Sequence, residues 1–432
     1  MLIEFKVSNY LSFKEEESFS MIAASDKSLE DNLIKMDNYN VLKSAILYGP
    51  NASGKTNLLV SIGFLRYLVV SSYKDSENKI ELDSFKLDDT FLDKPTKFEI
   101  MFIKNKIRYL YTLLINKNRI LEENLFHYPK GRKSYIFKRT EKTFSPKNNR
   151  ELNFVNEKTA NNILYLSMAG NLKVKPLMDA YLWFKENVRM DLPINPEEFN
   201  TKLINEEKGY IHLAEVFLRA ADMGIHKLEC KLEKSPPIEE TLPKDFPPKA
   251  KKAFEDMIVA LRSEKKLKSQ NEEAIIKTYH EGMDIEGKKK LVPFELGNES
   301  SGTISLFKLS GPIYYILKNG YTLFFDEMDT SIHPLIVEVI LKLFNDPLVN
   351  RNNAQLIFTT HNTAYLDLDN MRRDQIWFVE KRDDGSSELY SLVQYHPRKD
   401  HQIEKRYREG RYGAIPFFDL SELYGAFEEK GN

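Results

Sequence analysis

The sequence lacks the features of a disulfide-bonded, secreted or membrane protein. Its 432 residues include one cysteine, Cys230, so neither an intrachain disulfide nor a cysteine-based zinc site can form. No apolar run approaches the ~20 residues that cross a membrane, and residues 1–6 do not have the pattern of a signal peptide. We therefore expect a cytoplasmic protein without a membrane partner.

The sequence also has no surplus of charge. It carries 63 basic and 64 acidic residues, so the net charge of −1 gives no argument for nucleic-acid binding, although a local basic patch stays open. Hydrophobic residues, by contrast, make up 42% of the chain. This content indicates a packed globular protein, and the length is enough for two or three hydrophobic cores.

A phosphate-binding loop is the strongest signal in the sequence. Residues 49–56, GPNASGKT, satisfy the pattern G-x-x-x-x-G-K-[ST] without a mismatch. They follow an apolar run at 45–48, typical of a strand, and precede a segment of good helix formers at 57–67. A strand before this pattern and a helix after it are the context in which it binds the phosphates of a nucleotide.

Each residue type in this loop has a physical reason. The glycines let the backbone turn tightly, so that successive N–H groups point at the β-phosphate. Lys55 supplies positive charge to the β- and γ-phosphates, and the Thr56 hydroxyl can ligate Mg²⁺. The predicted nucleotide-binding residues are Gly49, Asn51, Ala52, Ser53, Gly54, Lys55, Thr56 and Asn57.

The rest of the chain alternates between strand and helix patterns. Period-two alternation predicts two strands within residues 1–24. It also predicts a meander within 96–145, with strands at 97–103, 108–115 and 134–139. Residues 158–223 are mostly helical in pattern. Prolines between 236 and 248 exclude a long coiled-coil arm, because each interior proline would cost ~3 kcal/mol. A charged helix at 248–269 and a β-hairpin at 274–296 are expected next.

A second part of the nucleotide site is predicted near residue 326. The apolar run at 321–325 indicates a buried strand, and it ends in Asp326 and Glu327. In a phosphate-loop enzyme, such a strand delivers Asp326 to Mg²⁺, directly or through water, and Glu327 polarises the attacking water as the general base.

Two further motifs have both a functional and a structural interpretation. Another predicted strand, at 354–360, ends in His361, which would act as a γ-phosphate sensor or be an ordinary surface or core histidine. Ser300, Ser301 and Gly302 precede a predicted helix at 304–317. They would form a second anion-binding concavity, or a Ser or Thr would cap this helix without a ligand.

The order of these motifs resembles that of an ABC-type ATPase head. GPNASGKT at 49–56 is followed by ESSGT (299–303), LFFDE (323–327), MDTSIHP (328–334) and FTTHN (358–362). More closely, the chain resembles the prokaryotic AAA-labelled ATPases of the RloA, abortive-infection and OLD-like group, which are relatives of SMC-type ATPases. NYLSF at 9–13 and YREGRYGAIP at 407–416 also resemble that group, so the likeness covers both ends of the chain.

The resemblance implies an α/β fold, an ABC-type head that hydrolyses ATP with Mg²⁺ as a dimer. By position, Ser300, Ser301 and Gly302 would contact the γ-phosphate bound by a second copy of the chain. Asp329 would lie in the loop that couples the two sites, and His361 would be the switch histidine. The implied domains are an N-terminal part of the head with Walker A and the meander (1–157), a mainly helical insertion (158–273), and a C-terminal part with signature, Walker B and switch histidine (274–432).

Two departures from the family pattern stand out. ABC heads usually have a glutamine between the phosphate loop and the signature that helps to hold Mg²⁺, but no glutamine precedes Gln270, which lies in a charged run. OLD nucleases add a large TOPRIM nuclease domain after the head, whereas only about 70 residues follow His361 here. We therefore expect the ATPase without an appended nuclease.

The sequence thus predicts an ATP-hydrolysing switch or sensor that acts as a homo-oligomer. By resemblance, it would control a separately encoded effector, such as a nuclease, in anti-phage defence. One alternative is a DNA repair or maintenance ATPase that binds DNA directly, and another is an OLD-like nuclease in its own right. A transporter ATPase fits less well, given the N-terminal strands and the unusual signature.

Overall fold

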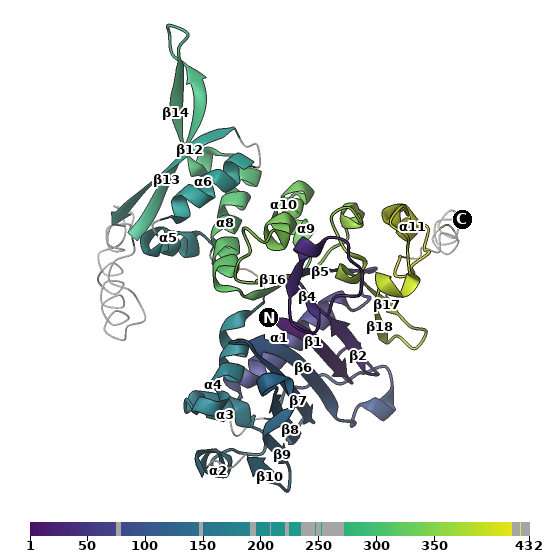
Figure 1. The fold of residues 1–432 in the computed structure, drawn as a ribbon. Helices are drawn as coiled ribbons and strands as arrows, with labels where there is room; N and C mark the ends of the chain where they lie inside the picture. Colours follow the sequence, from purple (N-terminus) through teal and green to yellow (C-terminus); the bar gives the residue numbers. More distant parts are fainter. Residues whose placement is uncertain are drawn as a thin grey trace. The chain divides into compact units, whose positions relative to one another are not determined.

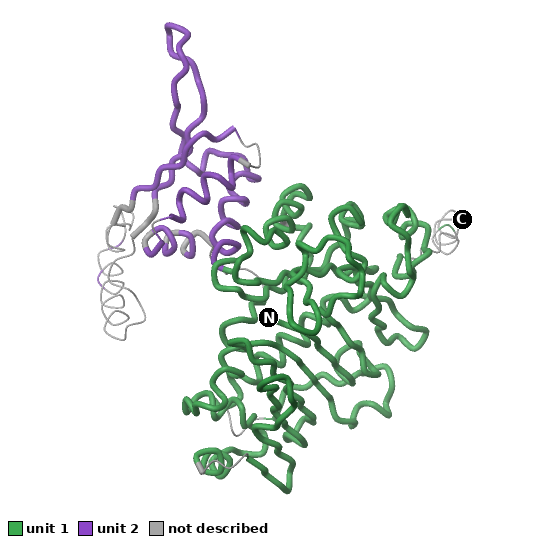
Figure 2. The backbone as a smooth tube through the Cα atoms, viewed as in Figure 1, with its two compact units in different colours: residues 1–191, 316–432 green, residues 192–315 purple. Residues whose placement is uncertain are grey.

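The chain forms two compact units in the computed structural model (Figures 1 and 2). The structure describes residues 1–74, 79–146, 150–190, 196–207, 209–220, 224–234, 247, 252, 272–416 and 424. Unit 1 comprises residues 1–191 and 316–432, and unit 2 comprises residues 192–315. The two units are defined by compactness alone. The predicted division into domains 1–157, 158–273 and 274–432 remains a prediction.

A seven-stranded antiparallel sheet forms one layer of unit 1, in the order β10-β9-β8-β7-β6-β1-β2 (Figure 1). The predicted N-terminal strands and the predicted meander are confirmed. The strands are β1 (Leu2–Ser8), β2 (Glu17–Ser20), β6 (Thr96–Lys104), β7 (Ile107–Ile115), β8 (Ile120–His127), β9 (Ser134–Thr140) and β10 (Phe144–Pro146).

A six-stranded sheet forms the second layer, in the order β11-β15-β16-β5-β17-β18. Its first five strands are parallel, and β18 runs antiparallel to β17. The predicted strand before the phosphate loop and those ending at Asp326 and His361 are confirmed. The strands are β5 (Ser44–Tyr48), β11 (Val188–Met190), β15 (Thr322–Phe325), β16 (Gln355–Thr359), β17 (Ile376–Lys381) and β18 (Ser387–Ser391). A small separate pair joins β3 (Leu33–Lys35) to β4 (Asn40–Leu42).

The helix α1 (Lys55–Ser71) shares one hydrophobic core with both sheets of unit 1. The Phe64 ring stacks on Tyr10, with centroids 5.1 Å apart, and lies 6.0 Å from the ring of Phe98 on β6. The helix that follows the phosphate loop is therefore fixed by packing as well as by its loop. The other helices of unit 1 are α2 (Arg150–Glu157), α3 (Tyr165–Asn171), α4 (Lys175–Leu182), α9 (Met328–Ser331), α10 (Pro334–Asn345) and α11 (Ile403–Arg408).

Unit 2 combines helices with a three-stranded antiparallel sheet, in the order β12-β13-β14. The predicted hairpin is confirmed as β13 (Glu272–Met283) and β14 (Lys289–Glu295), and β12 (Ile225–Lys234) is a strand that the sequence does not predict. The helices are α5 (Pro196–Glu206), α6 (Tyr210–Ala220) and the first part of α8 (Ser301–Asn319), which confirms the predicted helix at 304–317. Apart from Lys252, the predicted charged helix at 248–269 lies outside the described residues.

The unpredicted strand β8 contains a fully buried carboxylate, Glu123. Its oxygens accept hydrogen bonds from the Tyr111 hydroxyl at 2.9 Å and from the backbone N–H groups of Tyr165 and Leu166 at 2.7 and 2.9 Å. Arg139 forms an ion pair with it at 3.4 Å. Burial raises the pKa of Glu123, and Arg139 and the N–H donors oppose this effect. The sequence pattern does not indicate a core strand here, because residues 122–124 are all polar. Glu123 is nevertheless buried, since its carboxylate accepts the first N–H groups of α3.

We expect Glu123→Ala to lower the free energy of unfolding by about 3–5 kcal/mol, because it leaves Arg139 and two N–H groups buried without their acceptor. The matched control is Glu15→Ala, where the carboxylate is exposed and lies outside this network, so the change should stay within about 0.5 kcal/mol. Urea denaturation measures both. Equal losses would show that the Glu123 network does not stabilise the fold.

Candidate nucleotide site

The phosphate loop leaves the carboxyl end of β5, a strand buried along its whole length between β16 and β17. Close approach explains both glycines. A Cβ on Gly49 would lie 2.2 Å from the backbone oxygen of Val379, and one on Gly54 would lie 2.2 Å from the Ser387 hydroxyl. Gly54 also has φ +113°, a value that side chains disfavour. The loop therefore requires glycine at these two positions for space.

Lys55 lies at the first turn of α1, with its side chain turned back under the loop. Its ammonium donates hydrogen bonds to the backbone oxygens of Gly49 at 2.8 Å and Pro50 at 3.0 Å. Burial lowers the pKa of Lys55, while the nearby carboxylates of Glu327, Asp326 and Asp329 raise it. The Ser53 hydroxyl is buried without a hydrogen-bond partner among the described residues. A buried cation and an unpaired hydroxyl in one loop fit a bound phosphate chain.

The acidic strand meets the phosphate loop at Asp326. One oxygen of Asp326 accepts a hydrogen bond from the Thr56 hydroxyl at 2.8 Å, and the other accepts one from the Thr359 hydroxyl at 2.6 Å. Thr359 in turn accepts the backbone N–H of Glu327 at 2.7 Å. Residues from α1, β15 and β16 are thus linked through one carboxylate, as expected where parallel strands end at the same edge of a sheet.

The residues present also fit Mg²⁺. The Thr56 hydroxyl and the Asp326 carboxylate are the hard oxygen ligands that this ion prefers. The described residues contain no group of three or more His, Cys, Asp or Glu side chains that could hold a metal by themselves. Two protein oxygens match the usual Mg²⁺ site in phosphate-binding enzymes, where substrate phosphates and water complete the coordination.

Glu327 and His361 have exposed side chains at the same edge of the sheet. Glu327 has φ +47°, an unfavourable value for a residue with a side chain, and it is the N-cap residue directly before α9. The backbone N–H of His361 donates to the Asp329 carboxylate at 3.2 Å. The other oxygen of Asp329 is buried and has no partner among the described residues. Asp329 therefore holds the segment that carries His361.

The predicted signature lies in unit 2, at the start of α8. The Ser300 hydroxyl accepts the backbone N–H of Thr303 at 3.1 Å and shares a hydrogen bond of 2.8 Å with the Thr303 hydroxyl. Ser301 is exposed, and Gly302 is half-buried. Ser300 thus caps the helix, which is the structural interpretation of this motif. The anion-binding role of Ser300, Ser301 and Gly302 remains a prediction.

A chain of hydrogen bonds behind the loop involves two residues that the sequence does not single out, Ser12 and Ser387. The side-chain amide of Asn57 donates to the Ser12 hydroxyl at 2.7 Å. The hydroxyls of Ser12 and Ser387 are 2.8 Å apart, and Ser387 donates to the backbone oxygen of Ser53 at 2.5 Å. Because a hydroxyl has one proton and the Ser53 oxygen can only accept, Ser12 must donate to Ser387.

This hydrogen-bond network connects the phosphate loop to the N-terminal segment and to strand β18. Ser12 belongs to the NYLSF motif at 9–13, noted above only for its resemblance, and Ser387 lies on β18. The sequence alone does not indicate a role for Ser387, because this residue follows an ordinary turn sequence and lies more than 300 residues after the loop. Each hydroxyl both donates and accepts, so the network is fully satisfied and rigid.

The fold and this site define a phosphate-loop nucleotide-binding protein. A family model described as "AAA domain, putative AbiEii toxin, Type IV TA system" matches residues 44–369, most of the chain. The chain therefore belongs to this family of AAA/ABC-type ATPases of the abortive-infection group, as the motif order predicts. No curated protein matches the chain.

Solved structures of SMC heads are similar to the chain at a low level. An SMC head bound to the C-winged helix domain of ScpA has 12% identity and a TM-score of 0.45, covering 92% of this chain and 99% of that one. The SMC head domain from Thermotoga maritima has 13% identity and a TM-score of 0.38, covering 90% and 98%. A Pyrococcus furiosus SMC head with an extended coiled coil, bound to the C-terminal domain of ScpA, has 12% identity and a TM-score of 0.37. The match covers 91% of this chain and 97% of that one.

In the described part of the chain, no helix has the length and apolarity needed to cross a membrane.

We expect Ser387→Ala to weaken nucleotide binding by about 5–30-fold, because the loop carbonyl of Ser53 loses a buried donor worth about 1–2 kcal/mol. Ser391→Ala is the matched control, since this serine lies on the same strand and bonds only to backbone groups remote from the loop. Titration with a fluorescent ATP analogue measures both affinities. Equal affinities in the two variants would remove Ser387 from the site.

Proposed function

We propose that the chain is an ATP-hydrolysing switch that acts as a homo-oligomer and controls a separate effector protein. The observation that carries the proposal is the contact between Thr56 of the phosphate loop and Asp326 of the acidic strand. This contact joins two side chains that are 270 positions apart in the sequence, and their neighbouring oxygens support the proposal that both ligate Mg²⁺. The family match and the complete phosphate-loop motif support ATP as the nucleotide.

The residues of this site have distinct tasks in hydrolysis. Lys55 and the backbone N–H groups of residues 51–57 would bind the β- and γ-phosphates. Thr56 and Asp326 would hold Mg²⁺, which neutralises phosphate charge when bound. Glu327 accepts a proton from the attacking water, which is consistent with its exposed position at the end of the acidic strand. His361 donates a hydrogen bond to the γ-phosphate.

The switch role rests on the family and the motif order. Ser300, Ser301 and Gly302 would complete the site of a second copy, and Asp329 would couple the two sites through the segment of His361. The family description names a putative AbiEii toxin of a Type IV TA system, and membership of the abortive-infection group supports a role in anti-phage defence. The controlled effector would be a separately encoded protein, and a nuclease is the proposed class.

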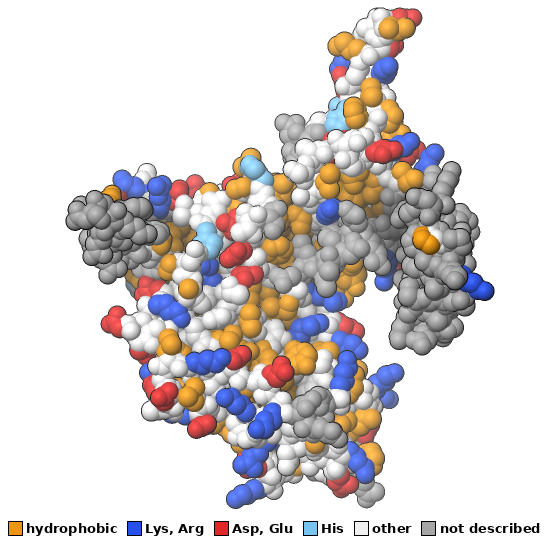
Figure 3. Space-filling model, turned by 180° about the vertical axis from the view of Figure 1, so that it is seen from behind, with side chains coloured by type: hydrophobic (Ala, Val, Ile, Leu, Met, Phe, Trp, Pro, Cys, Tyr) orange, Lys and Arg blue, Asp and Glu red, His pale blue; other side chains and the backbone are white. Residues whose placement is uncertain are grey.

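The two alternatives have no specific observation in their favour. Direct DNA binding would use a continuous basic surface, whereas basic and acidic side chains are interspersed on the face of unit 1 in Figure 3. A nuclease in its own right would need a second acidic metal site, and the described residues provide no cluster of this kind. The ATPase switch therefore remains the proposal.

The hydrolysis mechanism predicts different defects for two variants. Glu327→Gln should bind ATP with unchanged affinity but hydrolyse it ~10²–10⁴-fold more slowly, because the amide cannot accept the proton. Lys55→Ala should lose ATP binding itself, since the loop loses its cation. Equilibrium binding and phosphate release measure the two steps separately. Normal turnover by Glu327→Gln would assign the base to another carboxylate, and unchanged ATP affinity in Lys55→Ala would overturn the site.

The shared site predicts that two inactive variants restore activity when mixed. Lys55→Ala has a defective phosphate loop and an intact signature, and Ser301→Arg has the reverse defect, because its bulky charge blocks the approach of the second copy. A mixed dimer contains one intact composite site, so ATPase activity should reappear. Subunit exchange is verified with differently labelled chains. A mixture as inactive as its parts, despite exchange, would show that Ser300 only caps α8.

A further inference from the structure

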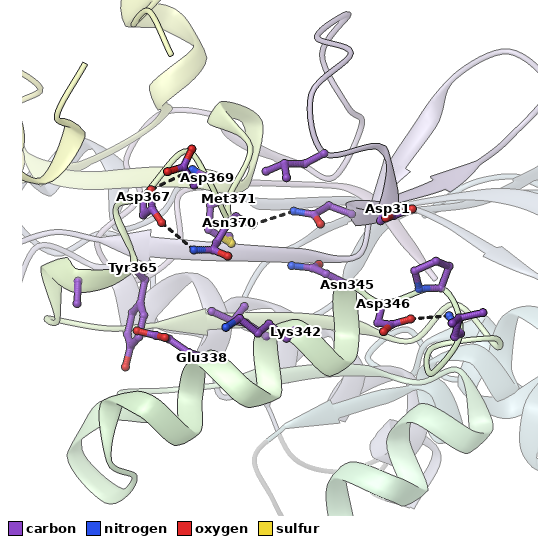
Figure 4. A pocket seen from close by; sticks show the side chains of 16 residues that line it. Asp31, Glu338, Lys342, Asn345, Asp346, Tyr365, Asp367, Asp369, Asn370 and Met371 are labelled. Atoms are coloured by element: carbon purple, nitrogen blue, oxygen red, sulfur yellow. Dashed lines mark hydrogen bonds between the residues drawn. The ribbon is translucent and has the colours of Figure 1, made fainter. Parts of the chain in front are cut away.

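A cavity of about 570 Å³ opens on unit 1 and shares no residue with the nucleotide site (Figure 4). One wall is the last part of α10 and the turn after it, at residues 346–348. The other walls are residues 29–32, around a short 3₁₀ helix, and the loop at 364–371. Its volume falls within the range of about 300–1,000 Å³ that is usual for ligand sites.

The charge of this cavity is strongly acidic. Five carboxylates line it, opposed by the single cation Lys342: they are Asp31, Glu338, Asp346, Asp367 and Asp369 (Figure 4). Asp346 and Asp367 accept hydrogen bonds from the neighbouring backbone and from Asn370. The side chains of Asp31, Glu338 and Asp369 form no hydrogen bond or ion pair with the described residues. The lining residues sum to a charge of about −4, and the buried ammonium of Lys43, which donates to the backbone oxygen of Asn345, offsets part of it. The concave surface therefore still attracts a cation.

An unpaired donor inside the cavity is independent evidence for a ligand. Asn345 is 8% exposed, and its side-chain oxygen accepts a hydrogen bond from the Ser44 hydroxyl at 3.0 Å. Its side-chain nitrogen has no acceptor among the described residues and points into the cavity in Figure 4. A side-chain N–H that faces a cavity and has no acceptor in the protein suits a ligand oxygen such as a peptide carbonyl.

These features together define the chemistry of the occupant. The described residues contain no group of three carboxylates close enough to chelate a metal, so a bare divalent ion does not fit. Phosphates of a nucleotide or nucleic acid would be repelled by the carboxylates. Apolar side chains of Leu29, Leu341, Leu348 and Met371 line the same cavity and suit the aliphatic stem of Arg or Lys.

We propose that this cavity binds a basic segment of a partner protein, with an Arg or Lys head group at the carboxylates and a backbone carbonyl at Asn345. Guanidinium groups pair well with carboxylates and are weakly hydrated, which favours Arg. This inference does not depend on ATP hydrolysis, because none of its residues lies in the nucleotide site.

A small peptide tests the proposal on the full chain. The probe is fluorescein-labelled acetyl-Arg-Leu-Arg-amide, and its binding is measured by anisotropy. The double variant Asp31→Asn with Glu338→Gln should bind the probe at least tenfold more weakly than the unchanged protein. Both side chains lack bonded partners among the described residues, so the melting temperature should stay the same.

The matched control is the double variant Glu15→Gln with Asp89→Asn, which removes the same charge from two exposed positions outside the cavity. It should bind the probe within twofold of the unchanged protein. Equal weakening in both double variants would overturn the proposal, as would absence of binding at millimolar probe. Spermidine has cations but no acceptor for Asn345, so competition by spermidine as effective as that of the unlabelled peptide would also overturn it.

Discussion

The carboxylate of Asp326 is the one group that joins the separate parts of the nucleotide site. Thr56 and Thr359 donate to its two oxygens from different elements, and the backbone N–H of Glu327 is held by the same Thr359. This is possible because β5, β15 and β16 are parallel neighbours, so their carboxyl ends reach one edge of the sheet. Everything assigned to the site depends on that arrangement.

The N-terminal segment and residues 372–387 support the sheet around the loop. Ser12 and Ser387 fix the loop carbonyl, and the fully buried side chain of Arg372 fixes the N-terminal segment. The Arg372 guanidinium donates to the backbone oxygens of Ala24 and Asp26 and pairs with Asp374 at 2.8 Å. A buried charge is tolerated here because each of the five guanidinium N–H groups has an acceptor. The nucleotide site therefore depends on residues 9–28 and on residues 372–387, which are far apart in the sequence.

The sequence predicted the parts of the site whose chemistry is local. A phosphate loop requires glycines and Lys55 within eight positions, and an acidic strand requires an apolar run before Asp326, so both can be read without a fold. Strand β8 was missed because Glu123 looks like a surface residue until its four partners are known. Ser387 was missed for the same reason, since its role exists only through contacts distant in sequence. Secondary-structure propensity depends on residues that are close in the sequence, whereas Glu123 and Ser387 act through contacts with residues that are distant in the sequence.

The acidic cavity and the nucleotide site are connected by the chain itself. Helix α10, which forms one wall of the cavity, begins at Pro334 soon after the acidic strand, and the loop at 364–371 follows His361 directly. If a ligand shifted either wall, the displacement would reach the segments that carry Glu327 and Asp329 or His361. Thermodynamic linkage makes such an effect mutual: a factor by which the occupant changes ATP affinity is the factor by which ATP changes the affinity for the occupant. With such linkage, the affinity for the partner would differ between the ATP-bound and ATP-free states of the protein.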